Sequence, residues 1–163
     1  EWGKPKYDDA ILFEMLILEG MQAGLSWSTI LVKRGNYRKA LDGFDPQKIK
    51  DYNQDKLDSL LQDAGLIRNR LKMRAIVKNA KAFIQVQAEF GSFSNYLWQY
   101  VSGHPIQHDY QTLSDVPASN DISEQMSQDM KKRGFSFVGP TICYAYMQSV
   151  GLVNDHLVSC DYR

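Results

Sequence analysis

The chain has 163 residues, of which 44% are hydrophobic, so it is long enough for one domain with a real core, and two small domains are also compatible with this length. Its 19 basic and 19 acidic residues give a net charge of zero, which argues against a protein that holds nucleic acid by bulk charge. No apolar run approaches the roughly 18 residues that cross a bilayer, and no charged leader precedes one, so we expect a soluble, cytoplasmic protein without a membrane partner.

Capping residues, glycine stops and apolar periodicity predict helices along the whole chain. Asp8 or Asp9 can cap the first helix, and Asp45-Pro46 pairs a capping residue with the residue favoured at the first helical position. The predicted helices run, in chain order, from about Asp9 to Gly20 or Gly24, from Ser26 to Asp42, from Pro46 as a short helix, from Gln54 to Gly65, from Arg70 to Phe90, from Phe93 to Tyr100, from Asp121 to Arg133, and from Thr141 to Val150.

Strand signals are nearly absent. Residues 102–120 contain Gly103, Pro105 and Pro117 among polar residues and are predicted to form a loop. There is no internal repeat and no low-complexity tract. The predicted fold class is therefore all-α, a compact helical bundle in one or two closely packed lobes.

Glu19 stands out because it follows 11-ILFEMLIL-18, where nearly every side chain is apolar. On a helix it shares a stripe with Leu12, Met15 and Leu16. Burying a carboxylate without a partner costs several kcal/mol, roughly, or forces the group to take up a proton. Either the fold or a ligand must therefore satisfy Glu19.

The segment 57-LDSLLQDAGLIRNRLKMRAIVKNAKAF-83 is predicted to be a helix, a tight glycine turn and a second helix. Such a turn directs backbone N–H groups outward at the start of the second helix, where the helix dipole also favours an anion. Arg68, Arg70 and Lys72 follow Gly65, so the expected ligand is a phosphate of a nucleic-acid backbone. The alternative, a simple connection between helices, remains open.

The basic residues are unevenly distributed. No acidic residue occurs between Asp63 and Glu89, and 131-KKR-133 forms a second basic cluster with no acidic residue after it until Asp155. The usual interpretation of such a run is a solvated helix face. Together with the glycine turn, it also makes Lys132 and Arg133 candidate DNA contacts.

Five segments together resemble one enzyme family. They are 1-EWG-3, 18-LEGMQAGLSW-27, 63-DAGLIRNRLKMRAIVKNAKA-82, 131-KKRGFSFVGPTICYAYMQ-148 and 151-GLVNDH-156. In this order they resemble 3-methyladenine DNA glycosylase I, a family of helix-hairpin-helix base-excision repair enzymes. The resemblance implies the helix-hairpin-helix DNA glycosylase fold as a single domain over residues 1–163. It also implies hydrolysis of the N-glycosidic bond of 3-methyladenine in alkylated double-stranded DNA, with the free base as product.

By this resemblance Glu19 is the carboxylate that recognises the base, Trp27 stacks on the base, and Trp2 also binds the substrate. The side-chain chemistry agrees, since an ionised carboxylate accepts hydrogen bonds from the exocyclic amine and attracts a base made cationic by methylation. An aromatic face attracts such a cation while it stacks. Without the resemblance, Trp27 would be interpreted as core packing.

The target atom lies inside a stacked duplex, so the nucleotide must be extruded and the gap filled. Gly24 and Leu25 stand on the expected turn between the first two helices, where an apolar residue could wedge into the base stack. We therefore expect both to contact DNA. The alternative for Leu25 is a core contact at a helix end.

Many helix-hairpin-helix glycosylases place a catalytic Asp beyond the hairpin, and the lyases add a Lys nucleophile. This chain has no Asp between Asp63 and Asp109, and Lys72 and Lys78 are interpreted as phosphate contacts. We expect a monofunctional hydrolase without lyase activity, because a cationic purine is already a good leaving group. Glu19, the one candidate catalytic residue, would then serve recognition more than acid–base chemistry. The alternative is a non-enzymatic module that binds damaged or abasic DNA.

His156 and Cys160 are four residues apart, a spacing that on a helix places both side chains on one face and suits zinc. A satisfied histidine near a buried cysteine is the alternative. The resemblance implies that this pair joins an N-terminal Cys and His around a structural zinc, and those partners would precede Glu1. Either a segment with these ligands precedes Glu1, or, if the chain begins at Glu1, we expect weak zinc binding or none. We also expect a monomer. Cys143 is interpreted as a small core residue.

Overall fold

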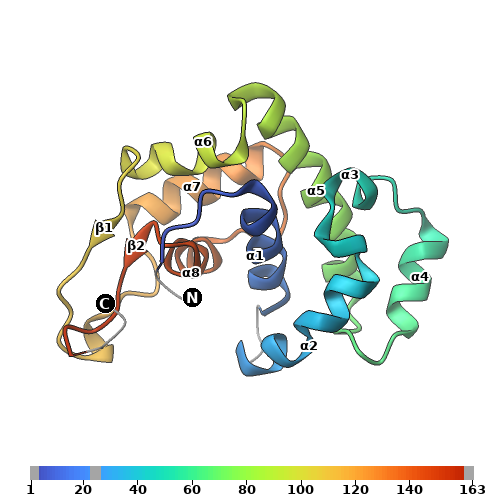
Figure 1. Ribbon diagram of the computed structural model, residues 1–163, viewed down its shortest axis with the longest axis horizontal. Helices are drawn as coiled ribbons and strands as arrows, with labels where there is room; N and C mark the ends of the chain where they lie inside the picture. Colours follow the sequence, from blue (N-terminus) through green and yellow to red (C-terminus); the bar gives the residue numbers. More distant parts are fainter. Residues whose placement is uncertain (1–3, 23–26, 160–163) are drawn as a thin grey trace.

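The computed structural model describes residues 4–22 and 27–159 and is built almost entirely from helices (Figure 1), which confirms the all-α prediction. The α-helices are α1 (Asp9–Gln22), α2 (Trp27–Ala40), α3 (Pro46–Ile49), α4 (Gln54–Gln62), α5 (Arg70–Phe90), α6 (Phe93–Trp98), α7 (Asp121–Lys132) and α8 (Pro140–Val150). The remaining elements are the 3-10 helices η1 (Asp42–Phe44), η2 (Gln99–Val101) and η3 (Leu113–Asp115) and the strands β1 (Ile106–Gln107) and β2 (Val153–Asn154).

Side-chain caps start several helices where the sequence predicted. The Asp8 carboxylate accepts a hydrogen bond from the backbone N–H of Ala10 at 2.8 Å at the start of α1, and Asp45 accepts one from Gln47 at 2.9 Å in α3. Helix α5 ends at Gly91, whose φ of 85° is the left-handed conformation that glycine adopts readily. These signals act within a few residues of the chain, so the bounds agree closely with prediction.

The segment at residues 102–120 differs from the predicted loop. It contains β1, which pairs in parallel with β2 so that Ile106 lies opposite Val153. A two-residue strand is too short to show an alternating pattern, and its partner lies far along the chain. Only the tertiary structure brings the two segments together.

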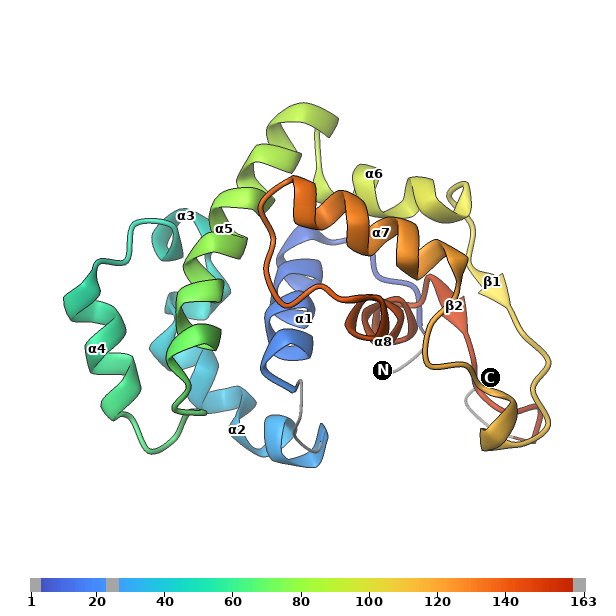
Figure 2. The ribbon, with the colours of Figure 1, turned by 180° about the vertical axis from the view of Figure 1, so that it is seen from behind.

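Helix α1 forms the buried centre of the molecule. Every residue from 12 to 21 is buried, and α1 lies between α5 and α8 in both views (Figures 1 and 2). Helices α2, α3 and α4 lie on one side of it, and α6, α7, α8 and the strand pair lie on the other. A helix covered on several sides needs no polar face, which explains the continuous apolar run. No described helix, α1 included, is long and apolar enough to cross a membrane.

Two acidic side chains attach α1 to its neighbours. Glu14 accepts hydrogen bonds from Arg34, at 3.2 Å, and from Arg38, both on α2. Burial alone would raise the pKa of Glu14, but these two guanidinium groups outweigh it and hold the pKa below its usual value. Asp9 accepts hydrogen bonds from the backbone N–H of Phe93 at 2.8 Å and of Ser94 at 2.9 Å, which joins the start of α1 to the start of α6.

Candidate functional site

Glu19 is buried on the side of α1 that faces α8. Only 4% of its surface is exposed, and its carboxyl group lies near the hydroxyl of Ser149. The stripe of α1 that packs against α5 includes Ile17, which lies roughly 200° around the helix from Glu19. The carboxyl group therefore points away from α5 and into the contact between α1 and α8.

The surroundings of Glu19 change its acidity. Burial raises its pKa to about 7, and the hydrogen bond with Ser149 offsets only part of this effect. A carboxyl group with this pKa changes its charge close to neutral pH, unlike a solvated carboxyl group. Such shifts are enriched at functional sites, so the acidity supports the selection of Glu19 from the sequence.

Two residues of α8 near Glu19 were not singled out in the sequence. Ser149, which is 1% exposed, donates its hydroxyl proton to the backbone oxygen of Tyr146 at 3.0 Å. The Tyr146 hydroxyl donates to the backbone oxygen of Leu12 at 2.7 Å. Both residues stand three apart on one face of an apolar helix, which is a weak signal for a polar site. Only the packing of α8 on α1 identifies their neighbour.

Several residues predicted to bind the base or DNA lie outside the described residues. These are Trp2, Gly24 and Leu25, and the side chain of Trp27 is also not described. The helix bounds nevertheless agree with the expected interhelical turn, since α1 ends at Gln22 and α2 begins at Trp27. Their roles in stacking, wedging and substrate binding remain predictions.

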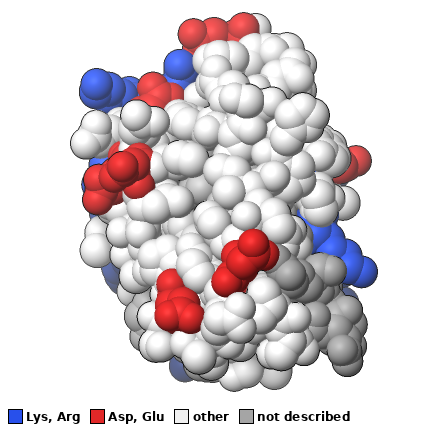
Figure 3. Space-filling view, turned by 90° about the vertical axis from the view of Figure 1, so that its left-hand side faces the viewer, with Lys and Arg blue, Asp and Glu red and all other residues white. Residues whose placement is uncertain are grey.

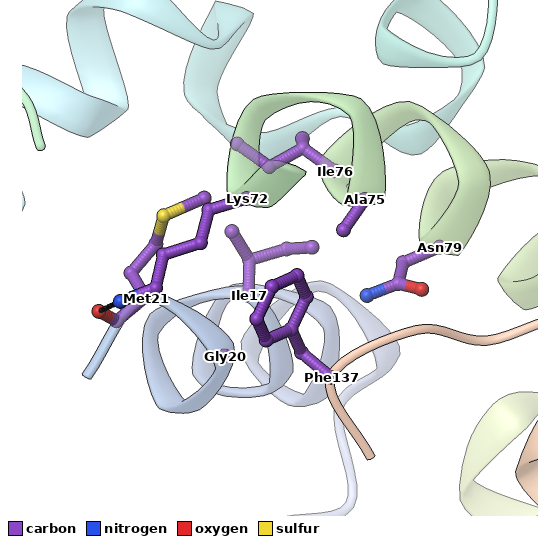
Figure 4. Close-up of a pocket in the computed structure, with 8 residues that line it drawn as sticks. All are labelled: Ile17, Gly20, Met21, Lys72, Ala75, Ile76, Asn79 and Phe137. Carbon is purple, nitrogen blue, oxygen red and sulfur yellow. Dashed lines mark hydrogen bonds between the residues drawn. The ribbon is translucent and has the colours of Figure 1, made fainter. Parts of the chain in front are cut away.

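A small cavity lies between α1, α5 and the segment before α8 (Figure 4). Its volume is about 10 Å³, which is room for roughly one water and far too little for a purine. It is lined by Ile17, Gly20, Met21, Lys72, Ala75, Ile76, Asn79 and Phe137. Because Glu19 lies on the other side of α1, this cavity is a packing feature and not the expected base site.

Lys72 does not occupy the position expected of a phosphate contact. Only 7% of its surface is exposed, and its Nζ donates a hydrogen bond to the backbone oxygen of Met21 at 2.9 Å. The last carbonyl groups of a helix lack partners within the helix, and a cation near them is favourable. Burial lowers the pKa of Lys72. The prediction of a DNA contact for Lys72 is corrected: this side chain secures the end of the helix that carries Glu19.

The connection between α4 and α5 contains Gly65, as predicted. The Gly65 N–H donates to the Asp63 carboxylate at 2.8 Å, and its oxygen accepts a hydrogen bond from the Asn36 amide at 3.1 Å. A β-carbon at position 65 would lie 2.9 Å from that amide nitrogen, so any larger residue there would force the Asn36 side chain to shift. Arg68 and Arg70 are exposed beside this turn, where a phosphate could reach them.

Arg133 is held by protein groups, whereas Lys132 is exposed. The Arg133 guanidinium donates to Asp129 at 2.7 Å and to Glu89, and it lies over the Phe90 ring at 4.9 Å. These contacts join α7 to the end of α5. The expected DNA contacts of Arg133 and Lys132 remain predictions, and Arg133 would have to bind phosphate while it holds Asp129 and Glu89.

The fold brings the two basic stretches of the sequence together. Lys78 and Lys81 of α5 line an open hollow of about 180 Å³ with Arg133 and Gly134. By contrast, the end of the molecule that carries β1 and β2 shows scattered acidic side chains on a largely uncharged surface, with Lys and Arg side chains only towards its edges (Figure 3). Phosphate binding is therefore favoured along α5 and not at the strand end.

The expected metal ligands do not form a site within the described residues. His156 lies in irregular chain after β2 and not on a helix, so the helical spacing assumed for His156 and Cys160 is wrong, and Cys160 lies outside the described residues. The described part of the chain contains no cluster of three His, Cys, Asp or Glu side chains able to hold a metal.

The neighbouring Asp155 has a structural role. It is buried and accepts hydrogen bonds from Tyr144, from His108 and, at 3.0 Å, from Gln148. These contacts fix the segment after β2 against α8 and the strand pair.

Comparison with known proteins gives one consistent result. A family model described as methyladenine glycosylase matches residues 1–163. A DNA-3-methyladenine glycosylase from Haemophilus influenzae is 49% identical over 160 residues, which cover 98% of this chain and 86% of the relative. A crystal structure of 3-methyladenine DNA glycosylase I superimposes with a TM-score of 0.96 at 45% identity, covering 99% of this chain and 88% of the other.

A second structural relative was crystallised with a ligand. It is a tyrosine-to-phenylalanine variant of 3-methyladenine DNA glycosylase I in complex with 3-methyladenine. Its TM-score is 0.96 at 38% identity, and the match covers 98% of this chain and 86% of the relative.

Proposed function

The chain belongs to the methyladenine glycosylase family, and we propose on this basis that it hydrolyses the N-glycosidic bond of 3-methyladenine in alkylated DNA. The observation that carries this proposal is the match to glycosylases over 98% or more of this chain, one of them with 3-methyladenine bound. Glu19 agrees with it, as a buried ionisable carboxyl group in an apolar helix. The helix-hairpin-helix segment and the exposed Arg68 and Arg70 supply a surface for the DNA backbone.

The reaction requires little acid–base catalysis from the protein. Methylation makes the purine cationic, so the bond between C1′ and N9 can break with its electron pair going to the base, while water adds to the sugar. The protein has to extrude the nucleotide from the duplex, hold the departing base and fill the gap that the nucleotide leaves. Glu19 would hold the base, with Trp27 and Trp2 stacking or lining the site and Leu25, after Gly24, filling the gap in the duplex.

Cleavage of the DNA strand by a lysine is not expected. A lyase needs an amine that can attack C1′. The Lys72 amine is buried and bonded to the Met21 backbone oxygen, and Lys78 is exposed on a later turn of α5. We therefore propose a monofunctional hydrolase that leaves an abasic site.

The decisive experiment incubates the protein with methylated duplex DNA and measures released bases by mass spectrometry. Released 3-methyladenine, with no strand cleavage until alkali is added, is the expected result. Replacement of Glu19 with Leu, which fits an apolar helix, should abolish release. If the wild-type protein releases no base but retains affinity for abasic DNA, the non-enzymatic binding module is the better description.

We further propose that any structural zinc is held by His156 and Cys160 together with ligands from outside this sequence. The described part of the chain supports this proposal, because it places no cluster of three possible metal ligands around His156. Metal analysis of a protein limited to residues 1–163 should then find well below one zinc per molecule. One tightly held zinc per chain, lost on His156→Ala, would contradict this expectation.

A further inference from the structure

Lys72, in the first turn of α5, is held at both its backbone and the tip of its side chain. Its backbone N–H donates a hydrogen bond to the side chain of Asn69, the residue that caps α5, at 3.1 Å. Its Nζ donates to the backbone oxygen of Met21 at 2.9 Å (Figure 4). This one residue therefore connects the cap of the hairpin's second helix to the end of α1.

The Met21 carbonyl group belongs to the last turn of α1, which ends at Gln22. The last four carbonyl groups of a helix have no partner within the helix, and the Lys72 amine supplies one here. Both Lys72 and Met21 are buried, so water does not compete for this hydrogen bond. Met21 follows Glu19 by two residues, and the contact therefore fixes the turn of α1 that carries Glu19.

The first turn of α5 has two functional sides. Arg70 and Lys72 lie roughly 200° apart around the helix axis, which places them on opposite sides of α5. Arg70 is exposed next to the hairpin, whereas Lys72 points inward to α1. The predicted phosphate contacts and the helix of Glu19 are therefore joined through a single turn of α5.

Excision requires these two parts to be in register. Contacts to phosphate position the DNA backbone, and the extruded nucleotide links that backbone covalently to the base held near α1. If α1 moved relative to the hairpin, each part could still bind its own portion of the substrate. The bond between C1′ and N9 would then be out of place, and a misplacement of about 1 Å can slow a reaction about 100-fold.

We propose that Lys72 is a positioning residue for base excision, which fixes α1, and with it Glu19, relative to the DNA-binding hairpin. This inference rests on the proposed function. Lys72 contacts neither DNA nor base in this role, because its amine acts through the Met21 backbone. It also takes no part in bond making or breaking.

Asn79 provides a matched control on the same buried face of α5. It lies seven residues after Lys72 and exchanges two hydrogen bonds with the backbone of Ser136, at 3.0 Å to the oxygen and 2.7 Å from the N–H. This pair joins α5 to the segment before α8 and not to the end of α1. Asn79→Ala therefore removes buried hydrogen bonds of the same kind while the Lys72 contact stays in place.

The test compares Lys72→Met with the wild type in three measurements, at a temperature where both are folded. Release of 3-methyladenine from methylated duplex, with protein in excess, should slow by about 10- to 100-fold. The affinities for free 3-methyladenine and for undamaged duplex should each stay within about twofold, since neither ligand spans both parts of the site. Asn79→Ala should lower stability but slow release by less than about twofold, because α1 keeps its place.

The outcomes separate this inference from the proposed function. Release at the wild-type rate by Lys72→Met, or a loss of free-base affinity as large as the loss of rate, would overturn the inference. Equal slowing by Asn79→Ala would overturn it too, because general destabilisation would then explain both variants. If the wild type releases no 3-methyladenine, the proposed function itself fails. Lys72→Gln, whose donor lies on a side chain one atom shorter, replaces Lys72→Met if that variant does not fold, and it should slow release in the same way.

Discussion

Two buried carboxyl groups on α1 show how neighbours set the charge of a residue. Glu14 lies between Arg34 and Arg38, which hold its pKa below the usual value. Glu19, one and a half turns later, meets a serine hydroxyl in place of a guanidinium, and burial raises its pKa. The same residue type on one helix is therefore ionised at one position and ready to be neutral at the other.

The pH dependence of stability should reveal this difference. Glu19 keeps a proton in the fold that the unfolded chain releases above its ordinary pKa, so the free energy of unfolding should decline as pH rises from about 4.5 to about 7. Glu19→Gln lacks this term, so its stability relative to wild type should grow over that range by roughly 3 kcal/mol at most. Urea unfolding at several pH values measures this. Because the Glu14 pKa is lowered, its contribution is lost only as pH falls below about 4.5, so the stability difference between Glu14→Gln and wild type should stay constant from about pH 4.5 to 7 and shrink at lower pH. A constant difference for Glu19→Gln would contradict the prediction.

Lys72 and Lys78 lie on the same helix but should respond differently to replacement with Met. Loss of the Lys72 hydrogen bond to Met21 leaves a helix-end carbonyl without its cation, which should lower the free energy of unfolding by about 1–3 kcal/mol. Lys78 is exposed, so Lys78→Met should change stability by less than about 0.5 kcal/mol and instead weaken DNA binding. Equal effects of both variants on the salt dependence of DNA binding would show that Lys72 also reaches phosphate.

At the scale of elements, the contact between α2 and the α4–α5 connection depends on a glycine, Gly65, at the point of close approach. Gly65→Ala would place its β-carbon 2.9 Å from the Asn36 amide nitrogen, so that amide must move and lose its bond to the Gly65 oxygen. We expect Gly65→Ala to cost about 1–2 kcal/mol of stability and to weaken DNA binding. Asn36→Ala frees the space, so the double variant should be more stable than the sum of the single effects implies. Strict additivity, measured by urea unfolding, would argue against this steric explanation.

Helix bounds were largely predictable because helices begin and end on local chemistry. Helix α5 spans Arg70–Phe90 as expected, since Asn69 caps its start and Gly91 ends it. The second helix stops at Ala40, short of the expected Asp42, because the chain then tightens into η1. Pairing of β1 with β2 was missed because two-residue strands carry no pattern of their own.

At the scale of the whole molecule, the basic residues of α5 and α7 lie along one continuous part of the structure. Arg70 lies at the hairpin end and Lys132 at the other, and both are exposed. If one duplex contacts both, Arg70→Ala and Lys132→Ala should each reduce the salt slope of DNA binding by about 1, and the double variant by about 2. Lys48→Ala, an exposed lysine on α3, is the matched control and should leave the slope unchanged. A double variant no worse than either single one would show that the two positions do not share a duplex.

Much of the candidate site could be predicted from the sequence. The parts that could not be predicted share one cause. An ionisable residue inside an apolar run identifies Glu19 because burial of a charge is costly wherever the chain folds. The sequence did not predict in the same way which basic residues face solvent. Lys72 and Arg133 looked like Lys78 and Lys132 in the sequence, yet the first two are bound to protein groups. The partners of a long cationic side chain come from distant segments.

The sequence by itself therefore determined the helices, the glycine turn at Gly65, the family resemblance and the unusual position of Glu19. Helix caps, glycine stops and apolar periodicity act over a few residues, and for that reason they can be recognised without coordinates. Only the tertiary structure decided that Ser149 faces Glu19 and that Lys72 holds the end of α1. Those facts depend on how α1 packs against α8 and α5, which joins groups that are far apart along the chain.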